Sequence, residues 1–138
     1  MSVYIPEKLR REIAERAKFV CEYCLLHEDD GFHTFHVDHI IPIKHEGLTS
    51  IENLSFTCPV CNRNKGADIA TVFYPSRIIV RLFDPRNDQW TDHFEIVNAE
   101  IKGKTQIGEA TIKILGFNLP ERIIERAFLI DIGRYPLI

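Results

Sequence analysis

Two Cys-x-x-Cys pairs contain the residues of this chain best suited to bind a metal. The pairs are Cys21/Cys24 and Cys58/Cys61, and they account for every cysteine in the 138 residues. Four thiolates in two short pairs can complete a tetrahedral zinc site and so join two distant points of the chain. Four unrelated buried thiols, the alternative, do not explain two matched pairs with no cysteine left over. We therefore expect one structural Zn²⁺.

Between the two pairs stands the dipeptide Asp38-His39, whose side chains suit metal-assisted hydrolysis. A hard cation such as Mg²⁺ prefers oxygen ligands, which Asp38 can supply. A neighbouring histidine can take the proton of an attacking water. Adjacent residues of a strand point to opposite faces, so both can serve one site only where the strand twists or ends. Pro42 favours such an end; the alternative is two polar residues that merely close a strand.

Two asparagines complete this set of polar residues. Asn62 directly follows Cys61 and can offer a second, neutral oxygen to the cation, or it can be an ordinary asparagine at a helix start. Asn53 lies in the loop between two extended segments. We expect its side chain to bond the backbone there and so to position His39.

From Cys21 to about Lys65, these motifs in combination resemble the HNH, or ββα-metal, endonucleases. The resemblance implies that His39 is the general base, Asp38 a ligand of the catalytic metal and Asn53 the middle residue of the family motif. Asn62 stands where the last letter falls, as in the HNN variant that carries a four-cysteine zinc site. The family implies hydrolysis of phosphodiester bonds, usually in DNA, with Mg²⁺ or Mn²⁺.

Charge gives a more modest indication of nucleic-acid binding. The formal net charge is −3 and the isoelectric point about 6.1, but residues 59–81 carry four basic side chains against one acidic one. Local potential governs contact with phosphate, so we expect Arg63 and Lys65 to meet the backbone of DNA; the alternative is an ordinary charged helix face. His36, two residues before Asp38, can contact the same phosphate or simply lie at the surface. A non-catalytic zinc-ribbon-like module that binds nucleic acid or protein is the alternative, but it has no need of Asp38, His39 and Asn62 together.

The predicted elements of the first half follow the ββα order. A helix is expected over about residues 6–18, strands over about 35–40 and 54–57, and a short helix over 59–65 that Gly66 ends. We expect residues 1–70 to form the zinc-stapled core of an α+β fold. Residues 71–138 would then be an extension packed on that core.

The second half carries weaker signals. Residues 77–83 and 94–97 are predicted to form one hairpin around the turn-rich segment 84–88, with Trp90 as a core or hairpin anchor. Thr105 is expected to cap a helix. The segment Asn118–Glu121 resembles a capping box that opens a last helix.

The remaining features concern compartment and partners. The charged N-terminal segment shows no signal peptide, and no apolar run approaches the length needed to span a bilayer. Cysteine pairs of this kind are metal sites in a reducing compartment, so we expect a cytoplasmic protein. DNA is the expected partner. The lack of a separate recognition domain favours low sequence specificity or a protein partner that supplies targeting.

Overall fold

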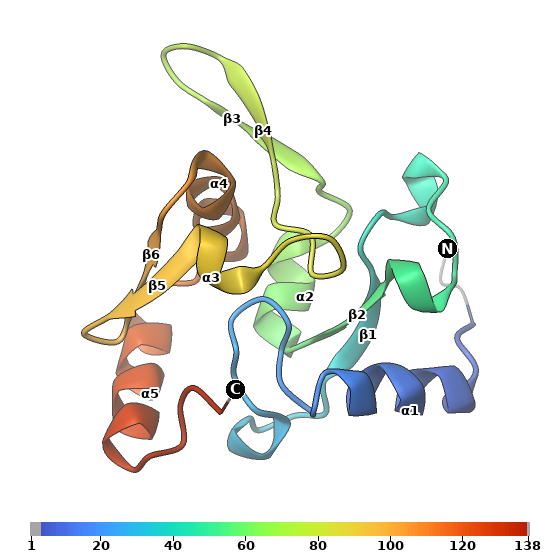
Figure 1. The fold of residues 1–138 in the computed structure, drawn as a ribbon, viewed down its shortest axis with the longest axis horizontal. Coiled ribbons are helices and arrows are strands. Elements are labelled where there is room, and N and C mark those ends of the chain that lie inside the picture. Colours follow the sequence, from blue (N-terminus) through green and yellow to red (C-terminus); the bar gives the residue numbers. More distant parts are fainter. Residues whose placement is uncertain (1–3, 138) are drawn as a thin grey trace.

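The computed structural model describes residues 4–137, which form small antiparallel hairpins surrounded by helices (Figure 1). Along these residues the strands pair as β1–β2, β3–β4 and β5–β6. In chain order the elements are α1 (Glu7–Arg16), β1 (His36–His39), β2 (Leu54–Thr57), α2 (Pro59–Lys65), β3 (Ala70–Phe73), β4 (Ile78–Arg81), α3 (Trp90–His93), β5 (Phe94–Val97), β6 (Glu100–Gly103), α4 (Gln106–Leu115) and α5 (Pro120–Asp131). The α+β class is confirmed.

The ββα unit forms where the sequence predicts it. β1 and β2 pair antiparallel, with His36 opposite Thr57 and His39 opposite Leu54. All four residues of β2 are buried, whereas β1 has one exposed and three half-buried residues. In this hairpin β1 therefore faces solvent, whereas β2 lies in the interior.

Helix α2 begins and ends with local signals. The backbone N–H of Cys61 donates to the Cys58 sulfur at the helix start, and Pro59 occupies the first turn, where its missing N–H leaves no helical bond unmade. Gly66 follows the last turn with a positive φ of 50°. The predicted bounds of this helix are confirmed.

Helix α1 fixes the chain that enters β2. Ile13 and Ala14 are buried on its inner face. The Arg16 guanidinium donates to the carbonyl oxygens of Ile51 and Leu54 at 2.7 and 2.6 Å. The last turn of α1 thus ties down the end of the loop that joins β1 to β2.

The predicted single hairpin of the second half is wrong. The strand expected over residues 77–83 is β4, and it pairs with β3, while β5 pairs with β6. The side chains of Asp84 and Asp88 accept hydrogen bonds from the backbone N–H groups of Arg86 and Asp84 respectively, which coils the segment between β4 and β5 instead of folding it back as a hairpin turn. In the β5–β6 turn, Asn98 and Ala99 both have positive φ. Such turns usually contain Asn-Gly, and the alanine in place of glycine made this turn hard to recognise from the sequence.

The two remaining helix predictions have different outcomes. Thr105 caps α4 as expected, because its hydroxyl accepts from the N–H of Gly108 at 3.0 Å. The capping box before α5 is wrong. The Asn118 amide instead bonds both backbone groups of Ile101, at 2.9 and 2.8 Å, and so joins α5 to β6.

One buried cluster runs through both halves of the chain. It holds Tyr23 and Leu54 from the first half together with Phe94, Ile101 and Phe117 from the second, each at most 1% exposed. A hydrogen bond also joins the two halves, because the Trp90 indole N–H donates to the carbonyl of Tyr23 at 2.8 Å. Trp90 is confirmed as an anchor of the interior.

The hydrogen bond between Tyr135 and Cys24 allows a test of whether the C-terminal segment stabilises the first half of the chain. Its buried hydroxyl donates to the Cys24 carbonyl at 2.6 Å. Tyr135→Phe leaves that carbonyl without a partner and should lower the free energy of unfolding by about 1–3 kcal/mol. Tyr74→Phe is the matched control, because Tyr74 is 79% exposed, and it should change little. Chemical denaturation of both variants measures the difference, and equal stability would show that the Tyr135 contact is dispensable.

Candidate active site and cysteine metal centre

The four cysteines converge on one point in the interior. All four are buried, and their sulfur atoms lie within 4.8 Å of one another. The Cys24 and Cys58 sulfurs are 3.7 Å apart. Within each pair, the backbone N–H of the second cysteine donates to the sulfur of the first, at 3.5 Å for Cys24 and 3.4 Å for Cys61.

This geometry fits a tetrahedral zinc ion. A Zn–S bond of about 2.3 Å sets the sulfurs of a tetrahedron about 3.8 Å apart. Hydrogen bonding, first of all with Cys21, lowers the pKa of the Cys24 thiol, whereas burial raises the pKa of Cys21 and Cys61. Several thiolates therefore cannot coexist in this interior without positive charge beside them.

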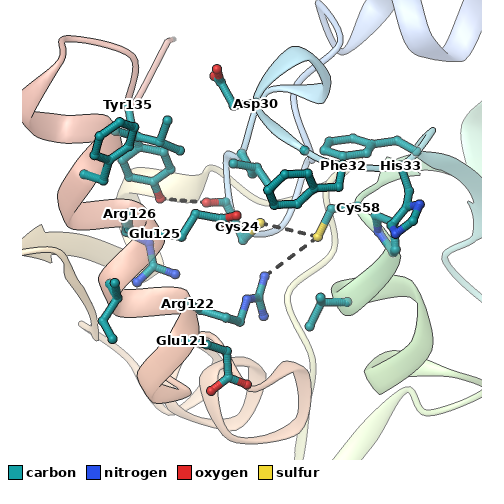
Figure 2. A pocket seen from close by; sticks show the side chains of 18 of the residues that line it. Cys24, Asp30, Phe32, His33, Cys58, Glu121, Arg122, Glu125, Arg126 and Tyr135 are labelled. Atoms are coloured by element: carbon teal, nitrogen blue, oxygen red, sulfur yellow. Dashed lines mark hydrogen bonds between the residues drawn. The ribbon is translucent and has the colours of Figure 1, made fainter.

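Part of that positive charge comes from Arg122 of α5, which points toward the sulfurs (Figure 2). Its guanidinium donates to the sulfurs of Cys61 and Cys58 at 3.2 and 3.7 Å. A second nitrogen donates to the carbonyls of Leu115 and Gly116. Burial by itself lowers the pKa of Arg122, but the charges of the cysteines outweigh it and raise the pKa. Sequence reasoning missed Arg122, because an arginine in an amphipathic helix gives no signal of burial.

A cavity of about 790 Å³ lies between α5 and the first cysteine pair (Figure 2). Phe32, Ile124 and Phe128 are among its lining residues, and Cys24 and Arg122 reach it from the metal centre. The cysteine cluster therefore borders a hollow that both halves of the chain line.

A second hollow, of about 590 Å³, lies at the end of β1. Asp38 and His39 both line it, although they are neighbours on a strand. The strand ends at His39, so the two side chains are free to serve the same space. Burial raises the pKa of Asp38, and the charge of Lys65 opposes the rise. A half-buried carboxylate beside an open hollow is a suitable ligand for a hydrated cation.

His39 is held by a residue that the sequence did not indicate. Its Nε2 lies 2.8 Å from the hydroxyl oxygen of Thr49, in the loop between β1 and β2. If Nε2–H donates to this hydroxyl, the lone pair of Nδ1 remains available for a proton. Arg10 and Lys44 also line the hollow and bring positive charge to it, and neither forms part of a recognisable motif.

Asn53 bonds the loop backbone as predicted. Its carbonyl oxygen accepts from the N–H of Ile41 at 2.9 Å, and its amide donates to the carbonyls of Ile41 and Leu48 at 2.9 and 2.8 Å. Gly47 allows this packing, since a Cβ there would lie 1.7 Å from the Ile41 carbonyl oxygen. These contacts close the loop that carries Thr49 onto the end of β1.

Lys65 lies inside the fold and not at the surface expected for a phosphate contact. It is 2% exposed, and its ammonium donates to the carbonyls of His39 and Ile40 at 3.3 and 3.1 Å. Burial lowers its pKa, and the charge of Asp38 opposes this effect. The ammonium therefore supports the end of β1 from behind.

The other predicted site residues are not among those that line the hollow. Asn62 is half-buried and lies one turn before Lys65, so the two side chains are neighbours on α2, and Lys65 bonds the carbonyl of His39 at the end of β1. Arg63 and His36 are exposed and free to meet a phosphate. Asn62 does not itself line the hollow, whereas Gly66 and Ala67 after α2 do.

Comparison with known proteins agrees with this geometry. Residues 21–68 match the model of the HNH endonuclease family. Searches of curated proteins and of solved structures each gave no match. Within residues 4–137, no helix is long and apolar enough to cross a membrane. The match begins at the first cysteine, covers both pairs and includes the Asp38-His39 strand. The chain therefore carries an HNH endonuclease domain with a buried four-cysteine cluster.

Proposed function

We propose that this protein is a metal-dependent endonuclease that hydrolyses phosphodiester bonds in DNA. A single Mg²⁺ or Mn²⁺ is held by Asp38 and Asn62, and His39 takes the proton from the attacking water. The observation that carries the proposal is that Asp38 and His39 line one hollow within an HNH domain. Asn62 is the second proposed ligand: it is half-buried on α2, one turn before Lys65, whose ammonium bonds the carbonyl of His39.

Each residue has a distinct task in this reaction. The cation, when bound, supplies positive charge to the phosphate and to the leaving oxygen. His39 is oriented by Thr49, which keeps Nε2 occupied and leaves Nδ1 to accept the proton. Arg10 and Lys44, which line the hollow, attract the phosphates on either side of the cleaved bond, and the exposed Arg63 adds positive charge on α2.

The four cysteines hold a structural Zn²⁺ in this proposal and take no part in the reaction. All four positions are filled by sulfur, so no open site is left for a substrate. The cysteines are free and not paired as disulfides, which suits a reducing compartment such as the cytoplasm. A protein partner would supply targeting, since DNA recognition beyond the site rests on few residues.

The zinc proposal predicts about one zinc per chain by elemental analysis. Cys58→Ser should lower both the zinc content and the melting temperature sharply, because metal binding and folding are coupled. Removal of zinc from the parent protein with a chelator should do the same. A metal-free protein with an unchanged melting temperature would refute a structural zinc site.

His39→Ala should remove most cleavage while leaving zinc content and DNA binding nearly intact. General-base catalysis contributes about 10²–10⁴-fold, so the rate should fall by that factor. His45→Ala is the matched control, since His45 is an exposed histidine of the loop that follows β1. Cleavage rates on plasmid and linear DNA with Mg²⁺ and Mn²⁺ measure the effect. If His39→Ala cuts as fast as the His45→Ala control, a non-catalytic zinc module becomes the better description.

The two asparagines should respond differently to metal concentration. Asn62→Ala removes one of two protein oxygens from the cation and should raise the Mn²⁺ concentration that gives half-maximal rate. Asn53→Ala breaks three hydrogen bonds of the loop and should slow cleavage through the position of His39, with little change in that midpoint. Titration of Mn²⁺ against rate compares both variants with the parent. A shifted midpoint in Asn53→Ala alone would reverse the ligand assignment.

A further inference from the structure

The β3–β4 hairpin, which we call the ribbon, projects from the body of the molecule (Figure 1). Its tip carries a large aromatic side chain, Tyr74, that is 79% exposed, and Ile79 on β4 is 75% exposed. Burying apolar side chains of this size is favourable, so their exposure at the end of a projection indicates a contact surface.

The charge of the ribbon has one sign. Residues 69–83 include two arginines and no acidic residue. Arg81 is engaged by Asp88, with nitrogen–oxygen distances of 2.7 and 3.0 Å, which leaves Arg77 as the exposed cation of the tip. Arg77 occupies the turn with φ of 63°, and its N–H donates to the Phe73 carbonyl at 2.7 Å. The tip therefore presents an aromatic ring and a guanidinium together.

The ribbon begins close to the proposed catalytic hollow and packs on α4. Gly66 and Ala67 line the hollow, and β3 begins three residues later at Ala70. At the end of β3 that leads into the tip, Lys113 of α4 donates to the Val72 carbonyl at 2.9 Å and lies over the Phe73 ring. These contacts favour one direction of the ribbon relative to the site.

We propose that the ribbon is the element that binds duplex DNA next to the cleaved bond, with Tyr74 and Arg77 entering a groove. This inference rests on the proposed nuclease function and names its substrate as a double strand. The major groove of B-form DNA is wide enough to admit a two-stranded ribbon, whereas that of A-form RNA is too deep and narrow. Proteins that bind single strands use a basic groove that follows the strand, whereas this element is a projecting hairpin (Figure 1).

Tyr74 and Arg77 make different contributions in this arrangement. Arg77 neutralises a phosphate or contacts a base edge, so its contribution depends on salt. Tyr74 and Ile79 offer apolar surface to bases and to thymine methyl groups, and this contribution does not depend on salt.

The experiment measures binding of a short fluorescent duplex by the His39→Ala protein over a range of salt concentrations. Arg77→Ala and Tyr74→Ala are each combined with His39→Ala. Lys102→Ala and Phe128→Ala are the matched controls, since Lys102 is an exposed cation of β6 and Phe128 an exposed aromatic of α5. Melting temperatures of all variants verify that the exposed substitutions leave the fold intact.

Arg77→Ala should weaken duplex binding about tenfold and reduce the slope of log affinity against log salt by about one. Tyr74→Ala should weaken binding by a similar factor with an unchanged slope. Both controls should bind as the His39→Ala protein does, and a single strand should bind more weakly than the duplex.

Two failures are distinguishable. If the parent protein cuts duplex DNA and both ribbon variants bind the duplex as tightly as the His39→Ala protein does, the inference is overturned, while the nuclease proposal stands. If the parent protein neither binds nor cuts DNA, the proposed function fails and the ribbon inference fails with it.

Discussion

The gathering of four cysteine sulfurs at one buried point is the constraint on which the rest of the structure depends. The first pair follows α1. In the second pair, Cys58 joins β2 to α2 and Cys61 lies in the first turn of α2, so the convergence of the pairs sets three elements against one another. A cluster of this kind concentrates negative charge in a dry interior, which is unfavourable unless cations compensate it. Arg122 supplies one such charge from α5, so even the last helix of the chain is positioned by the sulfurs.

The geometry of the proposed catalytic site depends on the position of the four-cysteine cluster. Cys58 and Cys61 determine where α2 begins, and α2 carries Asn62 and Lys65. Lys65 then bonds the carbonyls of His39 and Ile40, which fixes the end of β1. A buried ammonium is costly unless its donors are satisfied, so these two bonds strongly favour one position of the strand end. The hollow with Asp38 and His39 is thus supported from behind by the same helix that carries Cys61 of the four-cysteine cluster.

The second half of the chain is part of the core and not a separate attachment. Phe94, Ile101 and Phe117 pack in the same buried cluster as Leu54 of β2. Arg86 pairs with Glu22, whose carboxylate also accepts from the N–H of Phe56. Loss of this half would expose the interior of the HNH domain. The second half also carries the ribbon, so it combines support of the core with the proposed DNA contact.

The sequence by itself determined the features that rest on local signals. The two cysteine pairs, the strand at residues 54–57 and the helix bounded by Pro59 and Gly66 were predictable because each depends on spacing or on residues next to it in the chain. The loop bonds of Asn53 were predictable for the same reason. Thr105 was recognised as a cap because a helix start needs an acceptor for its free N–H groups.

Only the tertiary structure decided the features that depend on partners far along the chain. Nothing in the sequence around Lys65 distinguishes it from a surface lysine. It is buried because α2 packs against the end of β1, where the carbonyls of His39 and Ile40 accept its hydrogen bonds. The sequence around Asn118 is typical of a helix cap, but the Asn118 amide forms its hydrogen bonds with the backbone of Ile101 in β6 instead of with the helix. β4 pairs with β3 because aspartate side chains coil the segment after it, and Arg122 reaches the sulfurs because the fold brings α5 to them. Local propensity cannot encode these choices, since each is settled by which distant group satisfies a buried donor, acceptor or charge.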